Sequence, residues 1–286
     1  AVFDTTAPSR PSLLSTEVTA SRADETSRVN IKWQSVPASD LMAYRLYRAQ
    51  EAGFDTTGAY LTSIPSTASS FADTTVAISE TYYYRLAAID SLGNTSEVST
   101  EILAFSYSSD VPVAITRSFN DASNSQSYQL AALPGAVNRP LSNSLDGQAG
   151  VDWQAFWDDG SESDYLIRYD GSNRFRFEPG VGFWLVSTSG WSVNDTFDTV
   201  TLEADTAASI GLHEGWNIIS NPLDKDVPWS RVNAATPDTL QRLWRFDGSF
   251  AEADTFASAK SGEAFYFLNA TGLDQLTIPY PGAPEA

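Results

Sequence analysis

The segment Leu166–Ser172 (LIRYDGS) is echoed further along the chain by Leu243–Ser249 (LWRFDGS). In both places a glycine-containing turn and an aromatic run follow, first at Glu178–Leu185 (EPGVGFWL) and then at Lys260–Phe267 (KSGEAFYF). Asp-Gly between alternating residues is a strong β-hairpin signal, because a type I′ turn needs positive φ angles that Gly and Asp tolerate. We therefore predict two copies of one small antiparallel sheet.

Three further pairs of segments match in the same order along the chain. They are Tyr128–Pro134 with Trp216–Pro222, Val151–Trp153 with Val227–Trp229, and Phe197–Leu202 with Leu273–Ile278. One sheet alone would leave an apolar face in water, so we expect the copies, about residues 125–205 and 206–280, to pack face to face about a pseudo-twofold axis. Short helical turns are expected at Trp229–Ala235, with Ser230 as the cap, and around Asp238–Leu240.

The first hundred residues contain short alternating runs separated by turn residues, which is typical of a β-sandwich. The residues in these runs that carry a family pattern are Pro8 and Pro11, Trp33, Tyr44–Tyr47, Thr81–Asp90, Gly93-Asn94 and Ser96. In this order they resemble a fibronectin type III domain over about residues 8–105, with a tyrosine-corner position in the penultimate strand. The resemblance implies a spacer or adhesive module without catalytic residues.

The sequence thus predicts an all-β chain: a fibronectin type III-like sandwich followed by an internally duplicated antiparallel β-sandwich domain. We divide it into an N-terminal extension (residues 1–7), the first domain (8–105), a linker with an entry strand (106–124) and the duplicated domain (125–286). The second half resembles modules of bacterial surface and secreted proteins that carry a Gly-Trp-Asn-hydrophobic-Ile-Ser-Asn-Pro strand. Gly215–Pro222 fits that pattern closely, whereas Tyr128–Pro134 departs from it and Ala264 stands where glycine is expected.

Composition excludes several functional classes. The 286 residues include no Cys and one His, His213, which excludes disulfides, thiolate zinc sites and Cys nucleophiles. A formal charge of -19 would repel nucleic acids and anionic membranes. We find no apolar run of roughly 18 residues, so no membrane insertion is expected. The N-terminus, Ala1–Asp4, lacks a basic and apolar leader, so we interpret the sequence as a mature or excised form.

The acidity also indicates a location. Short carboxylates with few ammonium groups keep a surface hydrated when salt screens their repulsion. We therefore expect an extracellular or cell-surface protein of a bacterium, from a saline environment; simple solubility of a secreted acidic protein is the alternative.

An acidic loop in copy one is a candidate metal site. Its carboxylates, Asp158, Asp159, Glu162 and Asp164, could hold Ca²⁺ through oxygen ligands. The spacing lacks the Glu at the twelfth position of a calcium loop, so a solvated acidic turn is the alternative. We expect no other cofactor.

Eight tryptophans are the other candidate resource. Trp184, Trp216 and Trp244 fall where the other copy has Tyr266, Tyr128 and Ile167, which indicates packing positions. Trp157 and Trp191 have no counterpart in copy two and adjoin turn residues, so they are the candidate ligand-binding residues, with a sugar ring as the ligand. Burial in an interface between domains is the alternative.

We therefore expect a non-catalytic extracellular structural or interaction protein: a surface or filament subunit, or a fragment of a larger exported protein. Its partners would be other proteins or copies of itself, joined through the extended segment Val2–Pro8 at a sheet edge, unless that segment is a flexible terminus. The alternative is a carbohydrate-binding accessory region of a secreted polysaccharide-degrading enzyme, with polysaccharide as partner. Paired carboxylates could support glycoside hydrolysis, but no motif selects a pair, and a hydrolase triad would require His213.

Overall fold

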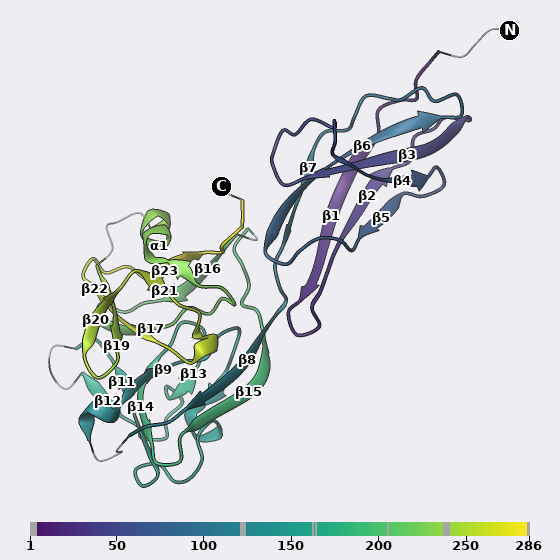
Figure 1. Ribbon diagram of the computed structural model, residues 1–286. Coiled ribbons are helices and arrows are strands. Elements are labelled where there is room, and N and C mark those ends of the chain that lie inside the picture. Colours follow the sequence, from purple (N-terminus) through teal and green to yellow (C-terminus); the bar gives the residue numbers. More distant parts are fainter. Residues whose placement is uncertain are drawn as a thin grey trace. The chain divides into compact units, whose positions relative to one another are not determined.

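A computed structural model describes residues 5–120, 124–161, 163, 165–204, 206–236 and 241–284. The chain divides into two compact units, Ala1–Ser108 and Ser109–Ala286, here called unit 1 and unit 2 (Figure 1). Both units are built of antiparallel strands, which confirms the predicted all-β class.

Unit 1 is a sandwich of a three-stranded sheet, in the order β1-β2-β5, and a four-stranded sheet, in the order β4-β3-β6-β7. Its strands are β1 (Ser12–Ser21), β2 (Thr26–Gln34), β3 (Leu41–Ala49), β4 (Tyr60–Pro65), β5 (Ser70–Asp73), β6 (Glu80–Asp90) and β7 (Ile102–Ser106).

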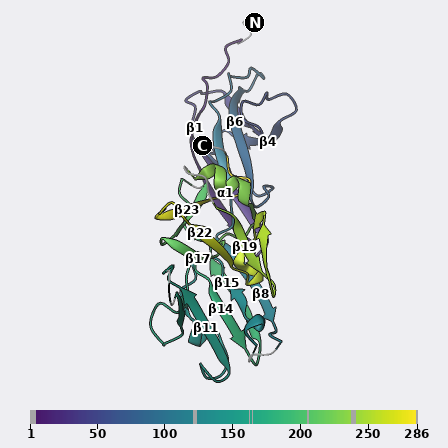
Figure 2. The same cartoon turned by 90° about the vertical axis from the view of Figure 1, so that its left-hand side faces the viewer.

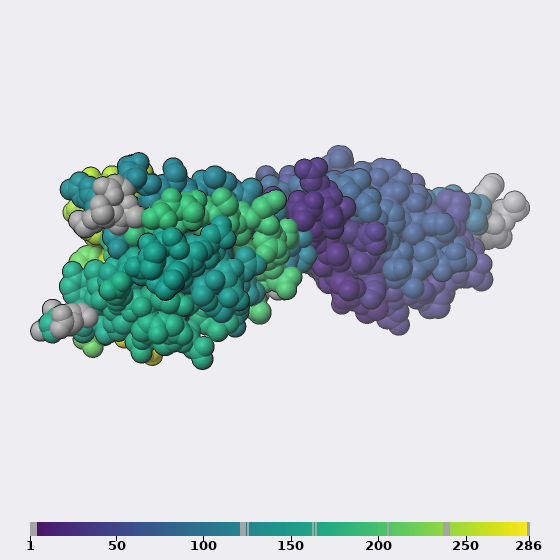
Figure 3. Space-filling model, turned by 90° about the horizontal axis from the view of Figure 1, so that it is seen from below, coloured from purple at the N-terminus to yellow at the C-terminus, as the bar shows by residue number. Residues whose placement is uncertain are grey.

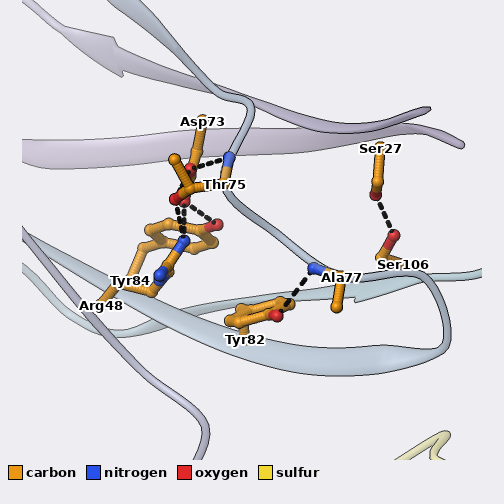
Figure 4. A network of polar contacts seen from close by, with 8 residues as sticks. All are labelled: Ser27, Arg48, Asp73, Thr75, Ala77, Tyr82, Tyr84 and Ser106. Atoms are coloured by element: carbon orange, nitrogen blue, oxygen red, sulfur yellow. Dashed lines mark hydrogen bonds and ion pairs between the residues drawn. The ribbon is translucent and has the colours of Figure 1, made fainter. Parts of the chain in front are cut away.

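Alternation along these strands builds the core of unit 1. Val29, Ile31 and Trp33 of β2 are buried, and the Trp33 ring meets Tyr44 of β3 edge to face at 5.4 Å between centroids. At the start of β6 the Tyr82 hydroxyl accepts a hydrogen bond of 2.9 Å from the Ala77 N–H (Figure 4). That bond is the tyrosine corner expected from the sequence.

Unit 2 contains two four-stranded sheets with the same strand order. The sheet of copy one runs β12-β11-β14-β9 and that of copy two runs β20-β19-β22-β17, and each copy adds two two-stranded ribbons, β10-β13 and β8-β15 in copy one, β18-β21 and β16-β23 in copy two. The matching orders confirm a duplicated antiparallel domain.

The bounds of the elements follow the chain. Copy one contains β8 (Asp110–Arg117), η1 (Ser125–Ser127), β9 (Gln129–Ala131), β10 (Arg139–Pro140), η2 (Leu141–Asn143), β11 (Trp153–Asp158), β12 (Leu166–Arg168), β13 (Arg176–Phe177), β14 (Phe183–Ser187) and β15 (Trp191–Asp198). Copy two contains β16 (Ala207–Gly211), β17 (Gly215–Ile219), β18 (Val227–Pro228), α1 (Trp229–Ala235), β19 (Leu243–Phe246), β20 (Phe250–Ala253), β21 (Thr255–Phe256), η3 (Ala259–Ser261), β22 (Phe265–Asn269) and β23 (Gln275–Pro279).

The sequence echo that reveals the repeat is displaced by one strand from the structural repeat. Leu243–Phe246 forms β19, which lies between β20 and β22, whereas Leu166–Arg168 forms β12 at the edge of its sheet. By sheet position the counterpart of β19 is β11, and the counterpart of Asp247–Ser249 is Asp159–Ser161. The prediction was wrong here because the loops before and after β12 both contain Asp-Gly, so local chemistry does not distinguish them.

Two other predicted matches are corrected by strand pairing. Val227–Pro228 pairs with β21 as Arg139–Pro140 pairs with β13, so Trp229 corresponds to Leu141 and not to Trp153. The strand equivalent to β23 is β15 and not Phe197–Leu202, because β15 pairs with β8 as β23 pairs with β16. The match of Tyr128–Pro134 with Trp216–Pro222 is in register, since Leu130 pairs with Trp184 and Ile218 pairs with Tyr266.

The stretch predicted as a linker contains a strand of the second unit. β8 pairs with β15 over eight residues, so Asp110–Arg117 is part of copy one. The helix expected at Trp229–Ala235 is present as α1, but its N-cap is Pro228 and no side chain caps it, so Ser230 does not have the predicted role. Residues 238–240 lie outside the described ranges.

The two sheets of unit 2 pack face to face, as expected. Reciprocal backbone bonds join them: the Ser220 N–H donates to the Gly180 carbonyl oxygen at 3.0 Å, and the Ala132 N–H donates to the Gly262 carbonyl oxygen at 3.1 Å. Ser220 and Ala132 are counterparts in the repeat, as are Gly180 and Gly262, so the bonds are related by a pseudo-twofold axis. Figure 2 shows the strands of the two copies in unit 2.

Gly182 and Ala264 are counterparts that meet each other at this axis. A Cβ added to Gly182 would lie 2.6 Å from the Ala264 Cβ and 2.7 Å from a methyl of Ile218. Only one of the two positions can therefore carry a side chain, which explains the Ala264 departure from the glycine expected there.

Candidate interaction surface

The candidate site is built on the face of each four-stranded sheet that packs against the other copy. Alternation places Leu130 and Trp184 of copy one on this face, with Ile218 and Tyr266 as their counterparts in copy two. These four are buried, and a second cluster on the opposite face of the copy-one sheet forms that copy's own core. The aromatic cluster between the copies is thus separate from the core within copy one.

A hydrogen-bond chain crosses between the copies inside this cluster. The Tyr266 hydroxyl donates to Asp158 Oδ2 at 2.6 Å, and the Trp184 indole N–H donates to the Tyr266 oxygen at 3.1 Å. Asp158 Oδ1 accepts the Gly160 N–H at 2.9 Å. The Asp158 side chain comes from β11 at the end of its strand, so the contact requires both copies to be packed.

Burial favours the neutral form of the Asp158 carboxyl. Desolvation raises the pKa of Asp158, and the hydrogen bonds from Tyr266 and Gly160 offset that rise only in part. Desolvation, and then the bond to Asp158, raise the pKa of Tyr266 above its usual range. The counterpart of Asp158 in copy two is Phe246, whose ring packs against Trp184 at 4.8 Å between centroids. One position of the repeat therefore makes a polar contact and its counterpart an aromatic one.

His213 holds the turn that follows β11. Its Nε2 lies 3.1 Å from the Asp158 carbonyl oxygen, and its Nδ1 lies 3.0 Å from the Glu214 carbonyl oxygen. The backbones of the two copies are so close here that a Cβ added to Gly160 would lie 2.2 Å from the Glu214 carbonyl oxygen. The imidazole therefore joins the two copies.

Two large aromatic side chains at the edge of the cluster stay exposed. Trp216 of β17 is 41% exposed and Phe250 of β20 is 53% exposed, and each ring lies 5.7 Å from the Tyr266 ring centroid. Phe250 also meets Trp184 at 6.2 Å. We call Trp216 and Phe250, with the ring edges of Tyr266 and Trp184 beneath them, the aromatic surface. Glu252, in the same strand as Phe250, forms an exposed ion pair of 2.8 Å with Arg242.

The sequence placed Trp216 among the packing residues and did not single out Phe250. Trp216 has the aromatic counterpart Tyr128, which is half-buried, so the repeat alone indicated an interior position. The signal that could have identified Phe250 was its position opposite Phe246 across the Asp247–Ser249 turn, since these two residues pair in β19 and β20.

The two tryptophans predicted to bind a ligand do not present open ring faces. Trp157 is half-buried between the His213 ring, at 5.9 Å, and the Arg174 guanidinium, at 5.7 Å. Trp191 is only 2% exposed and stacks on Phe177 at 5.4 Å. Trp191 was judged unpaired because its strand was aligned wrongly; as the first residue of β15 it is a core position. The structure therefore does not bring these two rings together as a platform.

The predicted calcium ligands are only partly within the described residues. Both oxygens of Asp158 accept protein hydrogen bonds and its side chain is buried. Asp159 accepts the Ser161 N–H at 3.0 Å, and this bond, together with the Ser161 side chain, lowers the pKa of Asp159. Glu162 and Asp164 lie outside the described residues. Among the residues that are described, no group of three or more His, Asp or Glu side chains is placed to hold a metal ion.

Unit 1 contains a comparable buried carboxyl (Figure 4). Asp73 at the end of β5 accepts from Arg48 Nη1 at 2.7 Å and from the Tyr84 hydroxyl at 2.9 Å, and Thr75 donates to it through its N–H and its hydroxyl. Desolvation alone would raise the Asp73 pKa, but these hydrogen bonds together hold it below its ordinary value. The cluster ties β5 of one sheet to β3 and β6 of the other.

No family model and no curated protein matches the sequence. Among solved structures, the chain is similar to a Fn3-like protein from Clostridium thermocellum, with 22% identity over 34% of this chain and 92% of that chain and a TM-score of 0.27. An fn3 domain of human contactin 1 has 19% identity over 38% of this chain and 87% of that one, with a TM-score of 0.30. A family 28 exopolygalacturonase from Yersinia enterocolitica has 13% identity over 38% of this chain and 21% of that one, with a TM-score of 0.25.

These likenesses cover about a third of the chain. In the described part, no helix has the length and apolar character needed to cross a membrane.

Proposed function

We propose that this chain is a non-catalytic interaction protein of a bacterial exterior, and that unit 2 binds its partner through the aromatic surface. The observation that carries the proposal is that Trp216 and Phe250, 41% and 53% exposed, lie against the same Tyr266 ring, whereas the other described large aromatic rings of unit 2 except Tyr165 are buried or half-buried. Exposed aromatic groups on a folded surface are typical of binding sites, because their rings supply large contact area with few rotatable bonds.

The aromatic surface is also held in one arrangement before a partner arrives. Tyr266 supports both exposed rings and is itself fixed by its hydrogen bonds to Asp158 and Trp184. A preorganised surface loses little side-chain entropy on binding. A non-catalytic role is supported as well, since the Asp158 carboxyl and His213, the groups best suited to acid–base chemistry here, are occupied in contacts that join the copies.

The partner in this proposal is another protein or a second copy of the chain, as in a surface or filament subunit. Unit 1, with its fibronectin type III-like sandwich, serves as a spacer or adhesive module. The acidic composition, with a net charge of -19, supports an extracellular location in a saline environment.

Self-assembly tests the proposal directly. Analytical ultracentrifugation and electron microscopy of the protein over a range of concentrations should show assembly that is lost in the double variant Trp216→Ala/Phe250→Ala. Leu14→Ala and Met42→Ala are matched controls, because these side chains of unit 1 are 62% and 53% exposed and lie outside the aromatic surface. Equal assembly of the double variant and the controls would contradict the proposal for a second copy as the partner.

A second candidate function is carbohydrate binding as an accessory region of a secreted enzyme. The indole of Trp216 favours it, because the apolar C–H faces of sugar rings pack on exposed aromatic rings. In affinity electrophoresis through neutral polysaccharides, retardation that Trp216→Ala abolishes and Leu14→Ala preserves would favour this function over protein binding.

A further inference from the structure

A polar hollow lies on the surface of copy one, away from the aromatic cluster. Its volume is about 300 Å³, and it lies between the segment Arg139–Asp146 on one side and Gly190–Val193, at the start of β15, on the other. Its lining includes the side chains of Arg139, Asn143, Asp146, Trp191 and Ser192. Figure 3 shows a face of unit 2 that is formed largely by residues of copy one, in teal and green.

The repeat shows that this hollow is particular to copy one. In copy two the segment after β18 forms α1, which packs on β23, the counterpart of β15, and fully buries Val232. In copy one the segment after β10 forms only the single turn Leu141–Asn143. The residues that follow, Ser144–Gly150 (SLDGQAG), contain turn formers and two glycines with positive φ, which disfavour a helix. The helix α1 thus covers this place in copy two, whereas in copy one the single turn leaves it open.

Hydrogen-bonding groups around the hollow are available. Within the described part of the chain, the Asn143 amide NH₂, the Asp146 carboxylate and the Ser192 hydroxyl have no hydrogen-bond partner. Trp191 also lines the hollow, with its indole nitrogen buried. Arg139 is fixed beside them by its ion pair with Asp195 and its position over the Phe197 ring at 5.1 Å.

The chemistry of these groups selects a ligand class. The amide and guanidinium N–H groups donate, while the carboxylate accepts and the serine hydroxyl does both. The Arg139 charge is balanced by Asp195, and a net charge of -19 disfavours anions. A ligand with several hydroxyl groups, each of which donates and accepts, satisfies such a set without adding charge. A volume of about 300 Å³ is at the small end of ligand sites.

We infer that this hollow binds one ring of a neutral sugar, with Asn143, Asp146 and Ser192 bonding its hydroxyl groups and Trp191 in the wall beside them. Trp191 is only 2% exposed, so it lines the hollow as a buried residue and is not the stacking platform expected from the sequence. The inference does not depend on the aromatic surface, because none of the residues named here belongs to it.

Nuclear magnetic resonance of the ¹⁵N-labelled full chain tests this site. The Trp191 indole N–H peak, identified by its loss in Trp191→Phe, should shift on titration with glucose, galactose, mannose, xylose or N-acetylglucosamine, with a millimolar dissociation constant expected of so small a ligand. The shift should be lost in Asn143→Ala/Asp146→Ala. It should persist in Asn194→Ala, which alters an exposed residue of β15 outside the lining of this hollow, and in Trp216→Ala.

Three outcomes would overturn the inference. They are no shift of the Trp191 peak with any of these sugars, a shift that survives in Asn143→Ala/Asp146→Ala, and a shift that Trp216→Ala abolishes. The altered hollow residues are surface residues, and the dispersion of the amide spectrum verifies that each variant is folded. Because assembly and polysaccharide retardation depend on Trp216, failure of this site leaves the proposed function standing, and the converse also holds.

Discussion

Each unit buries an aspartate that accepts a hydrogen bond from a tyrosine hydroxyl, and the two carboxyls respond to pH in opposite directions. Asp73 in unit 1 also accepts hydrogen bonds from the Thr75 N–H and hydroxyl and from the Arg48 guanidinium, and its pKa is lowered. Among the described residues, Asp158 in unit 2 accepts hydrogen bonds from Tyr266 and the Gly160 N–H, and its pKa is raised by burial. Because both carboxyls have a tyrosine donor, the additional donors to Asp73, Thr75 first and then the Arg48 cation, decide which protonation state the fold prefers.

The signs of the two contributions follow from linkage. The Asp73 pKa is below its ordinary value of 3.8, so its stabilisation is present above that pH and is lost as the pH falls through the folded-state pKa. The Asp158 pKa is above 3.8, so its contribution is complete below that pH and is lost as the pH rises through the folded-state pKa. Unit 1 therefore gains from an ionised carboxyl, whereas unit 2 gains from a protonated one.

The largest effect is expected from Arg48→Met. This change leaves Asp73 buried without its cation, so unit 1 should lose about 3 kcal/mol of unfolding free energy near neutral pH, a value reduced from that of a fully buried pair because Arg48 is 22% exposed. Urea unfolding followed by the nuclear magnetic resonance peak of the Trp33 indole N–H measures it, because the other seven tryptophans belong to unit 2 and would dominate the fluorescence. Lys32→Met is the control, since its ion pair with Glu17 is exposed and contributes about 0–1 kcal/mol. Equal losses in the two variants would remove the special role of Arg48.

Tyr266→Phe should destabilise unit 2 by about 2 kcal/mol. The hydroxyl is the donor to Asp158 and the acceptor of the Trp184 indole N–H, so its removal leaves two buried polar groups without that partner. Denaturant unfolding of unit 2 by near-ultraviolet circular dichroism gives the value. The control is Trp184→Phe, which removes the indole N–H donor to Tyr266 and should leave the hydrogen bond between Tyr266 and Asp158 intact. A loss of unfolding free energy no larger than that caused by a substitution at an exposed residue would show that the bond between Tyr266 and Asp158 does not stabilise unit 2.

Asp158→Asn should change the pH dependence more than the stability. Because ionisation of buried Asp158 is unfavourable, the variant should equal or exceed the wild type by up to about 1 kcal/mol at neutral pH and lose that advantage near pH 3. The matched change Asp73→Asn should have the opposite sign, with the loss greatest at neutral pH. Thermal unfolding of both variants between about pH 3 and 7 tests the pair. Parallel profiles for the two would contradict the comparison.

The smallest effect is expected from Tyr84→Phe, at about 1 kcal/mol or less. Asp73 keeps Arg48 and Thr75 after the hydroxyl is removed, so its charge stays compensated. The Trp33 indole N–H peak again reports the unfolding of unit 1. A loss larger than that of Tyr266→Phe would mean that the tyrosine bonds, and not the additional donors to Asp73, set the difference between the units.

The sequence predicted the features of the fold that depend on local alternation of apolar residues and on turn residues. The buried row Val29, Ile31 and Trp33 follows from a period of two, and the Tyr82 corner follows from its place at the start of β6. The existence of a repeat was also readable. Its register was not, because Asp-Gly occurs at residues 146–147, 159–160, 170–171 and 247–248, and only strand pairing shows that 159–160 and 247–248 are equivalent.

The candidate site could be predicted only in part for a similar reason. Exposure of Trp216 depends on what covers the end of β17, which no local pattern reports. The bond between Asp158 and Tyr266 joins residues 108 positions apart, on different copies. Trp191 was expected to be an open ring because it has no aromatic counterpart, but as the first residue of β15 it is buried in the core of copy one.

The crowding of Gly182 against Ala264 also bears on the difference between one duplicated polypeptide and a pair of identical subunits. Two identical subunits packed in this way could both carry glycine at the axis, but they could not both carry alanine in this packing, since the methyl groups would lie 2.6 Å apart. The methyl of Ala264 therefore requires two copies of different sequence, which a duplicated domain supplies within one chain.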